Sequence, residues 1–72
     1  MERKQVDSKG ALVRLAPDEL LTISNALNEA CNGLDLPEFQ TRMGVEREEA
    51  LRLLKSVHDL YNEVAKATSA IG

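Results

Sequence analysis

Four side chains are candidates for acid–base or nucleophilic chemistry: His58, Asp59, Tyr61 and Cys31. A catalytic histidine needs a partner that orients its ring, and on a helix that partner stands three or four residues away. No carboxylate occupies those positions around His58, and Asp59 points in another direction. Cys31 falls on the apolar side of a predicted helix, without a nearby positive charge to lower the pKa of its thiol. We therefore predict no catalytic residues and no enzymatic activity.

Metal binding is also not expected from the sequence. Residues 28–39 resemble the calcium loop of an EF-hand, with Gly33 at its sixth position. That alignment puts Ala30 at a ligand position and Phe39 where the bidentate glutamate belongs. One histidine and one cysteine also fall short of a zinc site within one chain. We predict no metal and no cofactor, and interpret Gly33 and Pro37 as a helix stop and a helix start.

The longest element that the sequence predicts is an amphipathic helix over residues 46–67. Its apolar side chains recur at steps of three and four, in a seam formed by Ala50, Leu53, Val57, Leu60, Val64, Ala67 and Ile71 and widened by Leu54 and Tyr61. At about 1.5 Å per residue such a helix exceeds 30 Å, so part of the seam needs another partner.

The remaining elements complete a prediction of an all-α fold, a small three-helix domain with a long C-terminal helix. Pro17 and Gly33 bound a first helix at 17–32, and Pro37 and Gly44 bound a second at 37–43. The first and third helices should pack antiparallel. Residues 1–15 are predicted as a short extended arm, with turn composition at 7–10 and a short strand at 11–15; a hairpin there is the alternative.

The whole chain, residues 1–72, is expected to be a single domain. A domain of this size buries only about 60% of its unfolded surface, and oligomerisation is a common remedy. We predict a homodimer formed by side chains beyond the reach of the first helix: Leu60, Val64, Ala67 and Ile71. No apolar run is long enough to span a membrane, the N-terminus lacks the apolar core of a signal peptide, and the single cysteine agrees with a reducing compartment. The expected location is the cytoplasm.

A second candidate surface lies on the first helix. Its residues follow one another at steps of four, three and four: Leu21, Asn25, Asn28 and Asn32. Residues 17–39 carry five acidic and no basic side chains, which favours a basic protein partner over nucleic acid. Three carboxamides beside a leucine predict a partner-binding face; the alternative is a solvated surface that ends in an Asn-Gly cap.

Residues 39–54 resemble a helix-turn-helix module, with a short helix, a Gly-Val turn and apolar Ala50 and Leu53 on the next helix. This resemblance implies a dimeric DNA-binding regulator as the alternative function. The residues that would contact DNA are Arg42, Arg47, Arg52 and Lys55. The first turn of the would-be recognition helix carries Glu46, Glu48 and Glu49, which repel phosphates.

The run Ser24-Asn25-Ala26-Leu27-Asn28-Glu29-Ala30-Cys31-Asn32-Gly33, with the helix boundaries that follow it to residue 50, resembles a set of short uncharacterised bacterial helical proteins. The resemblance implies a compact helical bacterial protein, and no site residues come with it. The predicted function is a non-enzymatic protein–protein interaction or regulatory protein.

Overall fold

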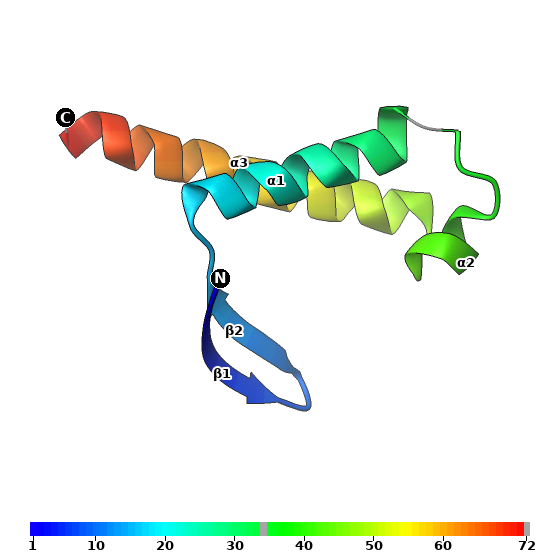
Figure 1. The fold of residues 1–72 in the computed structure, drawn as a ribbon, viewed down its shortest axis with the longest axis horizontal. Helices are drawn as coiled ribbons and strands as arrows, with labels where there is room; N and C mark the ends of the chain where they lie inside the picture. The colour runs from blue at the N-terminus through cyan, green and yellow to red at the C-terminus, as the bar shows by residue number, and fades with distance from the viewer. Residues whose placement is uncertain (34, 72) are drawn as a thin grey trace.

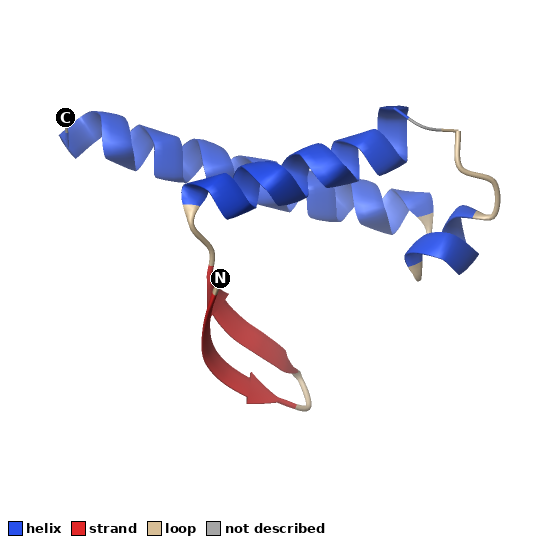
Figure 2. Cartoon of the chain, in the orientation of Figure 1, coloured by secondary structure: helices blue, strands red, loops and turns tan. Residues whose placement is uncertain are grey.

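The computed structural model describes the backbone of residues 1–33 and 35–71, and the side chains of residues 1–33 and 35–67. Figures 1 and 2 show a β-hairpin that projects from a pair of antiparallel helices. The elements are β1 (Glu2–Asp7), β2 (Gly10–Arg14), α1 (Pro17–Asn28), a π-helical turn η1 (Glu29–Gly33), α2 (Phe39–Met43) and α3 (Arg47–Ile71). The molecule measures 44 × 31 × 15 Å along its principal axes.

The predicted all-α class is wrong, because residues 2–14 form a two-stranded antiparallel sheet. Asp7 pairs with Gly10 around a two-residue turn, and Val6 pairs with Ala11. The Asp7 carboxylate accepts a hydrogen bond from the backbone N–H of Lys9 at 2.8 Å, and Gly10 adopts a φ of 150°. This turn lets the backbone groups of residues 2–7 find partners in residues 10–14, which an isolated extended arm cannot do.

The helices lie close to their predicted positions, with differences at their ends. Helix α1 begins at Pro17 as expected, but it continues into η1 instead of ending with a left-handed Gly33, whose φ lies outside that region. Helix α2 begins at Phe39, two residues after Pro37, because Glu38 takes a left-handed φ of 54° and separates them. Gly44, at φ 83°, ends α2 as predicted.

The core lies between α1 and α3. Among the described residues, five apolar side chains are buried: Leu20, Cys31, Phe39, Ala50 and Val57. Leu54, Tyr61 and Val64 are half-buried on α3 and continue the line of Ala50 and Val57 at helical spacing. Helix α3 runs past the N-terminal end of α1, and its last turns extend beyond the other elements (Figure 1). The core is therefore narrow, and much of α3 is open to solvent.

Candidate interaction surfaces

The first candidate surface is an apolar one, which we call the leucine face: Leu53 and Leu60 of α3 together with Ile23 and Leu27 of α1. Leu53 is 53% exposed, although it belongs to the seam predicted for burial, and Leu60, which was expected beyond the reach of the first helix, is 50% exposed. Ile23 and Leu27 are half-buried. At about 100° per residue, all four side chains fall on the side of the helix pair opposite the groove that contains Asn25 and Asn28.

The predicted dimer residues continue the leucine face along α3. Beyond Leu60, Val64 is half-buried and Ala67 is exposed. The side chain of Ile71 lies outside the described residues, although the helical backbone reaches that position. Helix α3 runs past the N-terminal end of α1, so its last turns lie beyond that helix (Figure 1).

The second candidate surface is a groove of about 450 Å³ between α1 and α3. Two of the predicted partner-binding residues, Asn25 and Asn28, line it beside Lys55 and His58. Asn32 does not line this groove, but its amide donates a hydrogen bond to the Asn28 side chain at 3.0 Å. Leu21 is 40% exposed on the same side of α1. The structure thus brings two of the three asparagines into one concave surface with a lysine and a histidine.

The arginines proposed for DNA contact do not form one surface. Arg47 is half-buried: its guanidinium lies 4.5 Å from the centre of the Phe39 ring and donates a hydrogen bond to the backbone carbonyl of Cys31. Arg42 and Arg52 are exposed. Lys55 pairs with Asp59 at 3.0 Å. Arg47 therefore links η1, α2 and α3 within the fold, which limits its reach toward a phosphate backbone.

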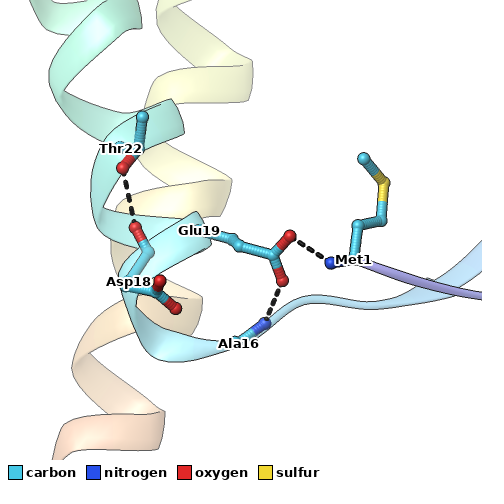
Figure 3. Close-up of polar contacts among 5 residues, drawn as sticks. All are labelled: Met1, Ala16, Asp18, Glu19 and Thr22. Carbon is cyan, nitrogen blue, oxygen red and sulfur yellow. Dashed lines mark hydrogen bonds and ion pairs between the residues drawn. The ribbon is translucent and has the colours of Figure 1, made fainter.

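The junction between hairpin and helices depends on Glu19, as Figure 3 shows. Its carboxylate accepts a hydrogen bond from the backbone N–H of Ala16 at 2.9 Å, the reciprocal half of a capping box, and also pairs with the N-terminal ammonium of Met1. The Met1 ammonium, and then the Ala16 bond, hold the pKa of Glu19 below its ordinary value of 4.5. Nearby, the Thr22 hydroxyl donates to the carbonyl of Asp18 at 2.8 Å.

The residues considered for chemistry lie on two elements, with Cys31 on η1 and His58, Asp59 and Tyr61 on α3. Cys31 is buried and free, whereas His58 is exposed in the groove. Within residues 1–33 and 35–67, no group of three histidine, cysteine or acidic side chains lies close enough to hold a metal ion. In the same part of the chain, no helix combines the length and apolar character needed to cross a membrane.

Two features of these surfaces were missed from the sequence. The apolar repeat predicts burial of Leu53, because a repeat of three and four does not show which edge of a wide apolar stripe a single partner helix covers. Ser24 is buried although it is polar, and it lines the groove between α1 and α3. The sequence signal for the first was the width of the stripe itself, which exceeds the contact of one helix.

Comparison of the chain with protein-family models, with curated protein sequences and with solved structures finds no match.

Proposed function

We propose that this chain is a non-enzymatic protein-interaction protein that works as a homodimer, with the leucine face of one copy packed against that of the other. The single observation that carries this proposal is the exposure of Leu53 and Leu60, each about half accessible on the outer side of a two-helix core. Fully burying a leucine contributes roughly 1.5–3 kcal/mol. Because Leu53 and Leu60 are already about half covered, burying the exposed half of each contributes roughly 0.75–1.5 kcal/mol, which still matters in a small domain.

The leucine face fits a second copy because its flanking charges are self-complementary. Leu53 and Leu60 are two helical turns apart. When two α3 helices cross antiparallel, Leu53 of each copy therefore lies opposite Leu60 of the other. Arg52 and Glu63 lie on one flank of this stripe, and neither forms an ion pair with another side chain that the structure describes. In the antiparallel arrangement, Arg52 of each copy lies beside Glu63 of the other.

Such a dimer is a four-helix arrangement built from two helical hairpins. It leaves the Asn-lined groove on the outer surface of each copy, where a partner protein would bind through Asn25, Asn28 and Leu21. The described residues that line the groove include Lys55 and no acidic side chain, so the partner would be recognised through hydrogen bonds to the asparagine amides. This second step extends the proposal from self-association to interaction with another protein.

Sedimentation equilibrium tests the dimer. We expect the apparent mass of the wild-type chain at 100 μM to approach twice the 7.9 kDa mass of one copy. Leu53→Asp with Leu60→Asp should return it to one copy, because a carboxylate in the interface is costly to desolvate. The matched control is Leu51→Asp, a leucine 37% exposed on the groove side, which should leave the mass unchanged. A wild-type mass of 7.9 kDa would refute the dimer.

Charge exchange identifies the antiparallel arrangement. Arg52→Glu alone should weaken association by placing two carboxylates together, and the double variant Arg52→Glu with Glu63→Arg should restore it. An equal loss in both variants would show that these side chains do not meet across the interface.

The partner step is tested with the same protein. Asn25→Arg with Asn28→Arg should leave the dimer mass unchanged and should abolish capture of the partner protein from a lysate of the source cells. Retention of every captured protein by this variant would reduce the groove to a solvated surface.

A further inference from the structure

The β-hairpin projects from the helical core, and its side chains are exposed except for the half-buried Val13. Val6 is 60% exposed and Leu12 is 63% exposed. An isolated two-stranded hairpin is barely stable in water, whereas three or more strands form a stable sheet. The hairpin is tied to α1 at its base through the Met1 ammonium and Glu19. The hairpin therefore has two edge strands to which a further strand could add.

The two open edges of this sheet differ. In β1 the register shifts between Arg3 and Gln5, so that Lys4 is an extra residue, and four of its six residues are charged. Bulges and charged side chains of this kind block pairing with another strand. In β2 the sequence Gly-Ala-Leu-Val precedes a single Arg14. Of the two edges, that of β2 is regular and apolar. Once it pairs with a second hairpin, the outer edges of the joined sheet are both β1 strands, and no further hairpin can add.

The edge of β2 is complementary to itself. Asp7 and Gly10 flank the two-residue turn as a hydrogen-bonded pair, so alternation along the ladder directs the backbone groups of Ala11 and Val13 outward. Antiparallel pairing of two β2 strands centred on Leu12 matches Ala11 of each copy with Val13 of the other. Arg14 then faces Gly10 of the second copy, whose missing side chain leaves room for the guanidinium to extend toward Asp7 of that copy.

We infer that β2 of one copy pairs antiparallel with β2 of a second copy, which creates a four-stranded sheet in the order β1-β2-β2-β1. Val6, Ala11 and Val13 share one face of each hairpin, because paired residues and alternate residues point the same way. In the joined sheet these side chains form one apolar face from both copies. Five paired residues bury less than the roughly 1,000 Å² that a stable interface needs. The inference therefore rests on the proposed dimer, which brings the copies together.

Disulfide trapping tests the pairing directly, in a full-length chain whose own cysteine is changed by Cys31→Ser. Leu12→Cys places two thiols opposite each other on the two-fold axis, about 4.5–5.5 Å apart between Cα atoms, within disulfide range. Gln5→Cys is the matched control, because Gln5 pairs with Leu12 but belongs to β1. Its two copies would lie three strand spacings, or about 14 Å, apart. Circular dichroism confirms that both variants keep their helices.

Under oxidised glutathione at 100 μM protein, we expect Leu12→Cys to form covalent dimer at least tenfold faster than Gln5→Cys. Adding Leu53→Asp and Leu60→Asp should slow the Leu12→Cys reaction to the control rate. Equal rates for the two single cysteines would overturn the inference, and a faster Gln5→Cys reaction would show that the β1 edges meet instead. If the native mass is dimeric while the rates are equal, the helical dimer stands and only the strand pairing fails.

Discussion

At the scale of single residues, Glu19 joins two parts of the chain that otherwise barely touch. One carboxylate accepts the backbone N–H of Ala16 at the start of α1 and also the ammonium of Met1 at the start of the hairpin (Figure 3). The first contact helps to begin the helix, and the second orients the hairpin on it. Because the side chain is solvent-exposed on both contacts, its effect on stability is expected to depend on pH and salt.

Glu19→Gln should therefore lower the unfolding midpoint at neutral pH, with a loss that vanishes in acid. The folded pKa of Glu19 is lowered, so its contribution is fully present above the ordinary value of 4.5 and disappears as the pH falls through the folded pKa below it. Thermal melts of both proteins between pH 7 and pH 2 measure this. A midpoint difference that stays constant across that range would contradict the assigned ion pair.

Arg47 is the second residue whose role follows from its contacts. It packs over Phe39 and bonds to the carbonyl of Cys31, so it supports the end of α1 and the start of α3 together. A cation–π contact and a charge-assisted hydrogen bond of this kind contribute about 1–2 kcal/mol together at a half-buried site.

Arg47→Ala should destabilise the fold by about 1–2 kcal/mol in urea unfolding, whereas Arg52→Ala, at an exposed position, should change it by less than about 0.5 kcal/mol in a dissociated sample at low concentration. The same pair of variants separates folding from DNA binding. The helix-turn-helix alternative would be supported by one result: the chain binds random duplex DNA with a steep salt dependence, and both substitutions abolish this binding without changing the free energy of unfolding.

At the scale of elements, η1, α2 and α3 meet around one small side chain. Ala50 is 1% exposed and packs in a cluster with Cys31 and Phe39, with Leu36 at its edge. Because the alanine side chain is small, η1 and α3 can pack close together at this residue. The long α3 is stabilised by this contact over only part of its length, and an i, i+4 pair of Lys55 with Asp59 supports its exposed side.

Ala50→Leu should overpack this contact and destabilise the fold by about 1–3 kcal/mol. Ala65→Leu is the control, since residue 65 is exposed on the same helix and the substitution should be close to neutral. Chemical unfolding followed by circular dichroism compares the two at one protein concentration. Equal midpoints would mean that η1 and α3 are not in tight contact at residue 50.

At the scale of the whole molecule, stability and association are expected to be linked. The described part of the chain buries few apolar side chains, while Leu53 and Leu60 are half exposed and most side chains of the hairpin are exposed. A dimer that forms only from folded chains stabilises the folded state by mass action.

The midpoint of thermal unfolding should therefore rise with protein concentration. A hundredfold increase, from 5 to 500 μM, adds about 2.7 kcal/mol per mole of dimer formed, and Leu53→Asp with Leu60→Asp should remove this dependence. Calorimetry at both concentrations measures it. Identical midpoints for the wild-type chain would indicate that folding and association are independent.

The sequence by itself determined the features that depend on neighbouring residues. Pro17 and Gly44 mark real helix boundaries, the turn at 7–10 forms, and the three-and-four repeat of α3 places Ala50 and Val57 in the core. Each of these follows from backbone preference or from the helical repeat, both of which operate over a few residues.

Only the tertiary structure decided the features that need partners distant in sequence. The extended arm became a sheet because residues 2–7 pair with residues 10–14, and strand pairing is hardly encoded in the composition of either strand. Leu53 was left exposed because α1, a single helix, covers one side of a stripe that is wider than its contact. Arg47 was directed onto Phe39 and Cys31 by the path of the chain through η1 and α2, which no spacing within α3 indicates.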